Sequence, residues 1–255
     1  MRFASIGSGS KGNATLVESN DTCIMVDCGF STKEVEKRLL NFVIKPEDIS
    51  AILVTHEHAD HVQGVARFSR KYATPVWMTQ GTYNRCRQRD DYPHISIFSS
   101  HDQFDIEDLT INPFPVPHDA AEPVQFVFSG DQYRLGLLTD TGSITPHIVE
   151  MLSGLDALIL EGNYDLGMLM NGPYPQSLKS RVSGAMGHLC NDQAADLLKK
   201  INCDKLQHLV AVHMSEKNNA NEHVVDAFSD ALGCSVDWIK LASQQHGFNW
   251  LEIAE

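Results

Sequence analysis

The sequence lacks the marks of several protein classes. No stretch approaches the roughly 20 apolar residues that a membrane-spanning helix needs, so we expect no association with a membrane. The first residues hold no long apolar segment and reach Gly7 and Gly9 almost at once, unlike a signal peptide. These two absences predict a cytoplasmic protein. No linker, low-complexity tract or block of like charges interrupts the chain.

Paired cysteines are also missing. No C-x-x-C pair occurs among the six cysteines, which are Cys23, Cys28, Cys86, Cys190, Cys203 and Cys234. In a chain of 255 residues this scatter is typical of reduced thiols in cores and loops. It disfavours both a disulfide framework and a zinc site built from cysteine.

Basic residues are few. Lys and Arg number 20 against 33 Asp and Glu, which gives a net charge of −13. Proteins that track nucleic acid by overall charge are usually basic. A polyanionic substrate would therefore have to be attracted locally, by metal ions and a few basic side chains. The hydrophobic fraction of 42% is enough for a sizeable core, and 12 histidines in one acidic chain are many.

Units of a strand followed by a helix recur along the chain. Strand-like runs bounded by turn residues predict strands at 2–6, 14–18, 22–27, 51–55, 109–116, 124–128, 133–139, 157–161 and 206–212. Apolar spacing predicts helices at 31–41, 62–71, 144–152, 192–200 and 222–232. Ser31 or Thr32 can cap the first of these helices. Residues 165–185 are predicted to form a long irregular connection. This pattern favours one compact α/β body.

The strongest chemical signal is the pattern H-x-H-x-D-H at residues 56–61. It follows a predicted strand and places four metal-binding side chains on one tight loop: His56, His58, Asp60 and His61. The two histidines that alternate along an extended segment point to the same side. Imidazole and carboxylate together suit zinc and related first-row ions. Because one open zinc site needs fewer ligands from one loop, the pattern hints at two ions. The alternative, a polar loop of capped histidines, is disfavoured by this spacing.

This pattern resembles the signature of the metallo-β-lactamase superfamily, and the resemblance runs the length of the chain. It implies an α/β fold, a four-layer αββα sandwich, with two divalent metal ions. In that superfamily further ligands follow near strand ends, where this chain has His118, Asp140 and His213. The resemblance implies one ion held by His56, His58 and His118, another held by Asp60, His61 and His213, and Asp140 as the bridge between them.

The resemblance also implies the chemistry. Two neighbouring cations would lower the pKa of a bridging water, supply hydroxide near neutral pH and clamp the substrate oxygens. Asp60 could orient that hydroxide. Zn²⁺ suits the ligand set best, with Mn²⁺ as the alternative. A di-iron redox site is disfavoured, because that branch typically carries an acidic residue where this chain keeps His58.

Residues 187–195, GHLCNDQAA, resemble the G-H-x-[ST]-x-x-Q-A-A stretch of nuclease branches such as tRNase Z. There the histidine pairs with an acidic residue at the end of an earlier strand and protonates the leaving oxygen. By this resemblance His188 is the proton donor and Glu161 its partner. Cys190 departs from the pattern, which often has a hydroxyl residue at that position. The alternative is that His188 only caps the helix that begins near Asp192.

Chain lengths between these residues limit what else the chain holds. Only 21 residues (119 to 139) separate His118 from Asp140, too few for the tRNA-gripping arm of tRNase Z. Only 47 residues (141 to 187) separate Asp140 from His188, too few for a β-CASP domain. We therefore expect a single domain over residues 1–255, with no β-CASP insertion and no tRNA-binding arm.

A smaller branch matches better, that of the YycJ/WalJ-type proteins, which resemble single-domain exonucleases acting from a 5′ end on DNA. Its marks stand at residues 8–13, 161–165, 172–181 and 213–219. The resemblance implies a 5′-to-3′ DNA exonuclease, with Asp60, Glu161 and His188 as catalytic residues and DNA as the nucleic-acid substrate.

Candidates for substrate contact lie in two of these segments: Ser8, Ser10, Asn13, Tyr174, Lys179 and Arg181. Residues 8–13 could offer backbone N–H groups to a phosphate, with a tight turn as the alternative. Lys179 and Arg181 could clamp phosphate and Tyr174 could stack on a base, with a solvated helix face as the alternative. We interpret three arginines as part of a solvated face, because Asp90 and Asp91 follow them at once: Arg85, Arg87 and Arg89.

Two further functions stay open. A small-molecule hydrolase of thioesters, lactones or cyclic phosphodiesters is favoured by the net charge of −13 and by the missing binding arm. A metal-bound interaction module without activity is disfavoured by the complete ligand set. The sequence leaves the oligomeric state open.

Overall fold

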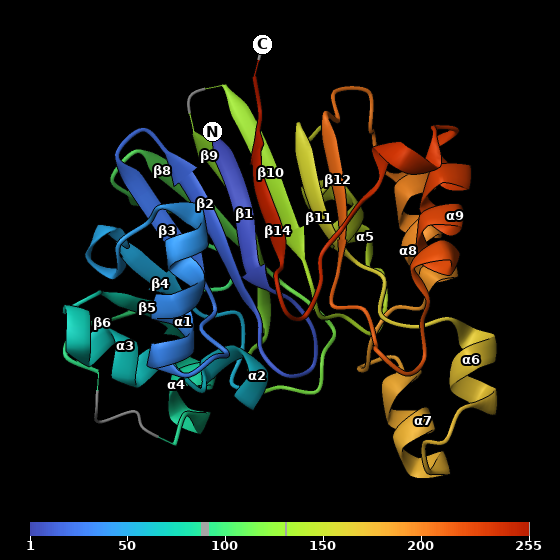
Figure 1. Ribbon diagram of the computed structural model, residues 1–255, viewed down its shortest axis with the longest axis horizontal. Coiled ribbons are helices and arrows are strands. Elements are labelled where there is room, and N and C mark those ends of the chain that lie inside the picture. Colours follow the sequence, from blue (N-terminus) through green and yellow to red (C-terminus); the bar gives the residue numbers. More distant parts are fainter. Residues whose placement is uncertain (88–91, 131, 255) are drawn as a thin grey trace.

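The computed structural model describes residues 1–87, 92–130 and 132–254. In this part of the chain the strands form two seven-stranded sheets (Figure 1). The first sheet has the order β14 (Phe248–Glu252), β1 (Arg2–Gly7), β2 (Ala14–Ser19), β3 (Thr22–Val26), β4 (Ala51–Leu53), β5 (Val76–Thr79) and β6 (Ile95–Phe98). The second has the order β13 (Lys240–Leu241), β12 (His208–Val212), β11 (Ala157–Glu161), β10 (Tyr133–Leu138), β9 (Val124–Gly130), β8 (Leu109–Pro115) and β7 (Phe104–Ile106).

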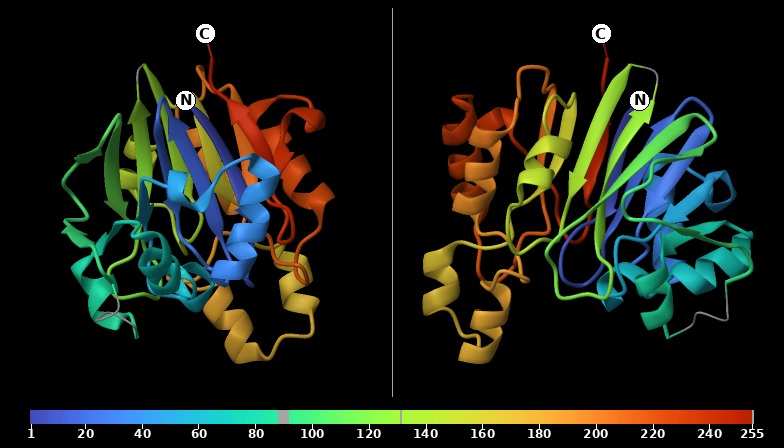
Figure 2. Two further views of the ribbon diagram at one scale, coloured as in Figure 1. Left: turned by 60° about the vertical axis from the view of Figure 1, so that its left-hand side comes forward. Right: turned by 180° about the vertical axis from the view of Figure 1, so that it is seen from behind.

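Helices flank this pair of sheets (Figures 1 and 2). On the side of the first sheet lie α1 (Thr32–Leu39), α2 (Ala59–Val62), α3 (Val65–Tyr72) and α4 (Gln80–Arg85). On the side of the second lie α5 (Pro146–Met151), α8 (Asn191–Lys200) and α9 (Asn221–Leu232). Two short helices, α6 (Leu166–Asn171) and α7 (Gln176–Val182), project beyond the sheets. The predicted αββα sandwich is confirmed.

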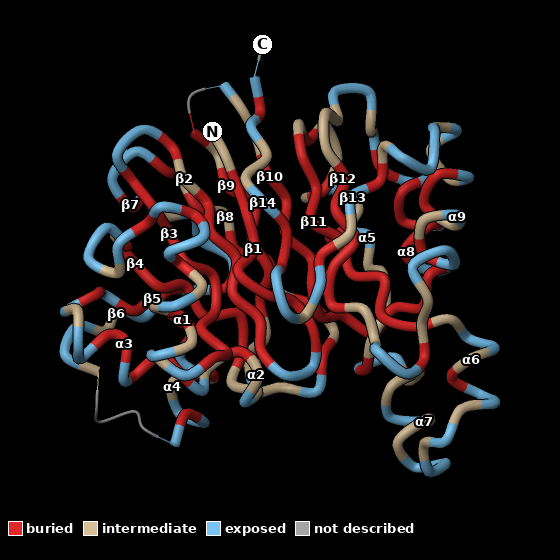
Figure 3. The backbone as a smooth tube through the Cα atoms, in the orientation of Figure 1, coloured by how far each residue is buried: buried red, intermediate tan, exposed pale blue. Residues whose placement is uncertain are grey.

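Both faces of the central strands are buried, and side-chain alternation assigns each residue to one layer. Phe3 and Ile24 belong to the core between the two sheets, whereas their neighbours Ala4 and Met25 pack under the helices. A third core lies between the second sheet and its helices. Each large apolar side chain buried in this way stabilises the fold by about 1.5–3 kcal/mol. Figure 3 shows the sheets as a buried interior; α7, by contrast, buries no residue.

The direction of the strands decides where the polar residues gather. β3 to β6 run parallel in the first sheet, as do β10 to β13 in the second. Carboxyl ends of parallel strands meet at one edge, the usual place for a site in an α/β protein. His56 follows β4, Asp140 follows β10, Glu161 ends β11 and His213 follows β12. The strand directions therefore bring these distant residues to one edge.

Several elements differ from the sequence prediction. Residues 165–185 are not irregular throughout, because they contain α6 and α7; the Asp165 side chain accepts the Met168 N–H at 2.7 Å and so starts α6. The predicted helix at 62–71 begins only at Val65, after Gly64. Strands β5, β6, β7, β13 and β14 are short and were not predicted. The predicted cap is confirmed, since Ser31 accepts the Glu34 N–H.

No helix in the described part of the chain combines the length and the apolar composition that crossing a bilayer requires.

Candidate metal centre and active site

Three histidines form one group of potential metal ligands. His56 and His58 lie on the extended segment after β4, and His118 follows β8. The Nδ1 atom of His58 lies 3.0 Å from His56 Nε2 and 3.3 Å from His118 Nε2. Their candidate ligand atoms all lie within 4.8 Å of one another. Three imidazole nitrogens that converge in this way match the ligand set of a zinc-type ion.

A second group combines one carboxylate with two histidines. Asp60 and His61 lie on α2, and His213 follows β12. Asp60 Oδ2 lies 3.4 Å from His61 Nε2 and 3.6 Å from His213 Nε2. The backbone of His213 has a φ of 52°, a left-handed conformation that is uncommon in a non-glycine residue and costs energy. This backbone turns the imidazole toward the edge where the other ligands gather.

Asp140 lies between the two groups. Its carboxylate is 3.1 Å from His213 Nδ1 and 3.4 Å from His61 Nε2, and it also forms a ligand cluster with His56 and His61. Asp140 Oδ2 and His213 Nε2 are buried and make no hydrogen bond. Leaving buried polar atoms without a partner costs about 1–3 kcal/mol each. A divalent cation would satisfy both atoms, so the residues present fit a metal.

The electrostatics of the centre favour a bound cation. Burial lowers the pKa of His56 well below its usual value, which keeps the imidazole neutral and its lone pair available. Burial also opposes the charged form of His61, but Asp140 and Asp27 outweigh it and raise its pKa well above normal. Burial would raise the pKa of Asp140, yet His213 and His61 lower it well below normal. Asp140 thus stays ionised and requires positive charge beside it, which a metal would supply in place of protons.

Three of the candidate ligand histidines are held by a partner on the ring nitrogen that faces away from the site. His56 Nδ1 lies 2.9 Å from Thr55 Oγ1, and His118 Nδ1 donates to the Gly187 carbonyl at 2.9 Å. His61 Nδ1 donates to Asp27 Oδ2 at 2.7 Å. Such partners set which ring nitrogen is free for the metal and orient the imidazole.

Asp27 is a functional residue that sequence reasoning missed. It follows β3, is buried, and also accepts the Thr55 N–H and hydroxyl at 2.8 Å each. Its φ of 61° is left-handed, as is that of His213. Its position at the end of a strand-like run could have indicated it in the sequence, because Asp140 and His213 also stand at the ends of such runs.

We predict that Asp27→Asn lowers metal affinity by about 10- to 100-fold, the usual effect of losing such a partner. The amide would place N–H groups where His61 Nδ1 now donates, and so would disturb the tautomer that leaves Nε2 free. Metal titration by calorimetry measures the effect, with circular dichroism to confirm the fold. Asp48→Asn, on the exposed surface, is the matched control. Unchanged affinity in Asp27→Asn would show that Asp27 has only a structural role.

Most of the backbone N–H groups in the loop at residues 8–13 are engaged within the protein. Those of Ser8, Gly9, Lys11, Gly12 and Asn13 donate to other protein atoms. Asn13 places its amide 3.3 Å from Asp60 Oδ2 and 3.2 Å from His61 Nε2, and the Ser8 hydroxyl accepts the His213 N–H at 2.9 Å. Ser8 and Asn13 therefore contact candidate metal ligands, and the expected nest of free N–H groups for a phosphate is not formed by these five residues.

His188 and Glu161 form a close pair beside the metal groups. His188 Nδ1 donates to Glu161 Oε1 at 2.7 Å, and Glu161 Oε2 accepts the N–H groups of Thr141 and Leu189 at 3.2 Å each. Glu161 is buried and the His188 side chain keeps 21% of its surface exposed. Burial lowers the pKa of His188, but the charge and hydrogen bond of Glu161 outweigh it and raise the pKa above normal. The imidazole is thus oriented, with Nε2 left free.

His188 is not the cap of the helix that follows. α8 begins at Asn191 with Cys190 as its N-cap; the Cys190 side chain accepts the Gln193 N–H, and the Cys190 N–H donates to the Gln193 side chain at 3.0 Å. A thiol thus takes the place where a hydroxyl is usual. The departure at Cys190 is therefore structural, and His188 is free for another role.

A cleft of about 350 Å³ opens onto these groups. Ser10, Tyr174 and Arg181 line it together with Asp60, Asp140, His188 and His213. Arg181 Nε donates to Asp119 Oδ2 at 2.6 Å, an ion pair that leaves its terminal nitrogens available for a substrate. Asp119, which sequence reasoning also missed, follows His118 directly and carries no signal of its own. Lys179 does not line the cleft: its ammonium donates to the Met170 carbonyl at 2.6 Å.

Of the three arginines expected on a solvated face, Arg85 and Arg87 are exposed. They line a separate hollow of about 400 Å³ that also contains His58. Arg89, Asp90 and Asp91 lie outside the described residues.

Known proteins share this sequence and this fold. Residues 22–214 match the family described as beta-lactamase superfamily domain. Exodeoxyribonuclease YycJ of Bacillus anthracis is 35% identical over 225 residues, which cover 87% of this chain and 85% of that protein. Exodeoxyribonuclease WalJ of Streptococcus pneumoniae is 31% identical over 248 residues, 93% of this chain and 92% of that protein.

A solved structure agrees with the fold. The metallo-β-lactamase fold protein YhfI from Bacillus subtilis superposes with a TM-score of 0.76 at 15% identity, and the match covers 98% of this chain and 99% of that one. The family match spans most of the chain, and the relatives align along nearly all of it. The chain therefore belongs to the metallo-β-lactamase superfamily, in the group of the YycJ- and WalJ-type proteins.

Proposed function

We propose that this protein is a metal-dependent phosphodiesterase that degrades DNA from the 5′ end as a 5′-to-3′ exonuclease. The observation that carries the proposal is the 2.7 Å contact between His188 and Glu161 at the mouth of the metal centre. The two relatives that align along most of the chain are named exodeoxyribonucleases. A small-molecule hydrolase of thioesters, lactones or cyclic phosphodiesters has less support. A thioester expels a thiolate, which leaves readily without a proton donor, and the relatives that align along most of the chain carry the name of DNA exonucleases.

The proton donor follows from the leaving group. Hydrolysis of DNA expels an alkoxide, which is a poor leaving group unless a general acid protonates it. His188 has Nδ1 fixed on Glu161, so its Nε2–H is the group that can reach an oxygen in the cleft. Glu161 cannot rotate away, because two backbone N–H groups hold its other oxygen.

We propose that the centre holds two ions, one on the three histidines and one on Asp60, His61 and His213, with Asp140 shared between them. When bound, divalent cations supply Lewis acidity to phosphate oxygens and lower the pKa of water. Zn²⁺ is the first candidate because imidazole dominates the ligand set, and Mn²⁺ is the alternative. Asp60, whose side chain keeps 24% of its surface exposed, is placed to orient the attacking water. Elemental analysis of protein purified without added metal tests both the number and the identity of the ions.

We propose that one domain carries this activity. The chain between His118 and Asp140 is used by β9, β10 and their connections, and the chain from Asp140 to His188 by α5, β11, α6 and α7. We infer that, in the described residues of these two segments, these elements leave no room for a tRNA-binding arm or a β-CASP domain. We also place the protein in the cytoplasm, because all six cysteines are free, as reducing conditions would keep them.

The direct test compares three substrates in the presence of Zn²⁺ or Mn²⁺. These are DNA labelled at the 5′ end, bis-p-nitrophenyl phosphate and a simple thioester. The proposal expects labelled mononucleotides to be released before shorter internal fragments appear. Thioester hydrolysis without release of nucleotides would instead identify a small-molecule hydrolase. Release from the 3′ end would overturn the proposed polarity.

We predict that Arg181→Ala raises KM for DNA by about tenfold. It should also reduce the slope of the logarithm of the binding constant against the logarithm of the salt concentration by about the amount expected for one phosphate contact. Arg181 lines the cleft with its terminal nitrogens free, and Asp119 holds it in place. Lys179→Ala is the matched control, since Lys179 lies on the same helix but bonds to Met170. Binding measured at several salt concentrations checks the prediction. Equal effects of the two substitutions would mean that α7 contributes only general positive charge.

A further inference from the structure

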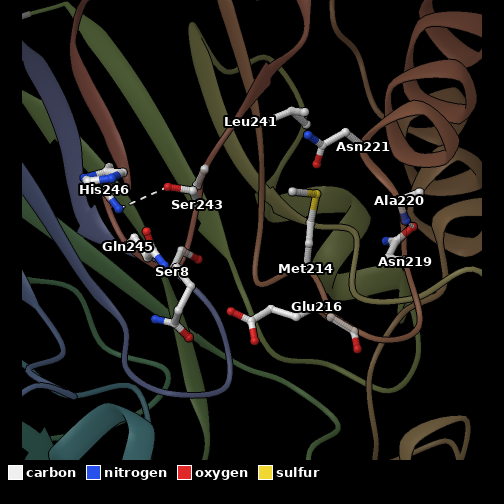
Figure 4. Close-up of a pocket in the computed structure, with 13 residues that line it drawn as sticks. Ser8, Met214, Glu216, Asn219, Ala220, Asn221, Leu241, Ser243, Gln245 and His246 are labelled. Carbon is white, nitrogen blue, oxygen red and sulfur yellow. Dashed lines mark hydrogen bonds between the residues drawn. The ribbon is translucent and has the colours of Figure 1, made fainter. Parts of the chain in front are cut away.

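A second cavity adjoins the metal cleft and has different chemistry (Figure 4). This side cavity measures about 560 Å³ and lies between the loop after β12, the turn after β13 and the start of α9. Met214 and Ser215 line both the side cavity and the cleft. Ser8 also lines the side cavity, while its hydroxyl accepts the N–H of the metal ligand His213 at 2.9 Å. The side cavity therefore lies beside the metal centre, since Met214 follows the candidate ligand His213 directly in the sequence.

The lining of the side cavity is polar but carries little charge. Amide side chains come from α9 and from the turn, and apolar surface comes from Met214 and Leu241. Among the described residues that line it there is no Lys or Arg; its ionisable side chains are His246 and Glu216, and Glu216 is paired with Lys11 at 2.6 Å. A phosphate would therefore find no lysine or arginine in this lining. The cleft next to it is lined by Arg181 and by the candidate metal ligands, which would bring the charge of the proposed ions.

Two of the amides are available to a ligand. Gln244 is already engaged, because it donates to the Gly12 carbonyl at 2.8 Å and accepts the Lys11 N–H at 2.7 Å. In the part of the chain that the structure describes, the side chains of Asn221 and Gln245 make no hydrogen bond. Figure 4 shows the Asn221 amide extending from the α9 side toward Leu241, with the Met214 thioether in the space between the turn and the start of α9.

We propose that the side cavity is a nucleobase subsite, which holds the base of a nucleotide whose phosphate lies at the metal centre; this rests on the proposed exonuclease function. A base has donors and acceptors along its edge, a flat apolar face and no charge. Asn and Gln amides pair with base edges, and a thioether packs well against an aromatic ring. The division of charge between the cavities places the phosphate in the cleft and the base beside it.

The test varies the base and the protein together. Single-stranded DNA is prepared intact and with one abasic residue at the first, second or third nucleotide from the 5′ end. Asn221→Ala and Gln245→Ala should each lower kcat/KM on intact DNA by about fivefold, and the double substitution by about 20-fold, as expected for one lost hydrogen bond each. One abasic position should cause a similar loss in the unmodified protein. On that abasic DNA the double variant should show no further loss.

Matched controls are Asn249→Ala and Gln103→Ala, which remove exposed amides outside the side cavity and should leave kcat/KM unchanged. A loss in the double variant that persists on every abasic DNA would overturn the subsite, as would abasic positions without effect. If the protein cleaves DNA but the rate does not depend on the base, the subsite proposal is wrong and the exonuclease proposal stands. Failure to release nucleotides from any DNA overturns both.

Discussion

Asp140→Ala is expected to lose metal and activity together. Asp140 contacts His61 and His213 of one group and forms a ligand cluster with His56 of the other, and its Oδ2 atom is buried without a hydrogen bond. Its removal takes away the one carboxylate that both ions would share and removes one of the buried negative charges beside His61 and His213. Metal affinity should fall by more than about 100-fold, the upper end of the effect of losing an outer partner, and hydrolysis should fall at least as far.

Elemental analysis after gel filtration measures the bound metal, and hydrolysis of bis-p-nitrophenyl phosphate measures the activity. Asp27→Asn provides the graded comparison, because Asp27 acts indirectly, through His61 and Thr55, and its substitution should cause a smaller loss. Circular dichroism excludes general unfolding as the cause. Two tightly bound ions in Asp140→Ala would remove Asp140 from the bridging position.

His188→Ala should keep the metals and lose about 10²- to 10⁴-fold in rate on an ordinary phosphodiester. The alkoxide leaving group then departs without a proton donor. On bis-p-nitrophenyl phosphate, whose leaving group is stable as an anion, the loss should shrink sharply. This difference between substrates is the signature of a general acid, because a residue that only binds or supports structure would slow both reactions alike.

Glu161→Gln should show the same pattern more mildly, since it weakens the orientation of His188 without removing the imidazole. Glu161 Oε1 also lies 3.4 Å from His213 Nδ1, so the metal content of this variant must be measured alongside its rate. Equal slowing on both substrates in His188→Ala would refute the acid role and remove the main support for a nuclease.

The candidate metal ligands were predicted from the sequence in two ways, by the spacing of the first four and by the family resemblance for the other three. Four of them lie within residues 56–61, where an extended segment and the first turn of a helix leave little freedom. His118, Asp140 and His213 each follow a strand, and strand ends in an α/β fold meet at one edge. The pairing of His188 with Glu161 spans 27 positions, and only the likeness to nuclease sequences indicated it.

The short elements could not be predicted. Strands such as β13, with two residues, have too few positions to show alternation, and they form because a neighbouring strand pairs with them. α6 and α7 have only six and seven residues, too few turns for a repeated apolar spacing to stand out, and α7 buries no residue. Long, strongly apolar segments were predicted well because burial determines both their pattern and their place.

The sequence by itself indicated the α/β fold class and a metal-binding loop at residues 56–61, and its likeness to known families predicted the rest of the ligand set and the pair that would handle the proton. Tertiary structure alone decided how the remaining polar groups are used. It engages the backbone of residues 8–13 internally, turns Lys179 to the Met170 carbonyl and directs Arg181 to the cleft. It also places Asp27 behind His61. These choices depend on contacts between segments far apart in the chain, to which no local pattern corresponds.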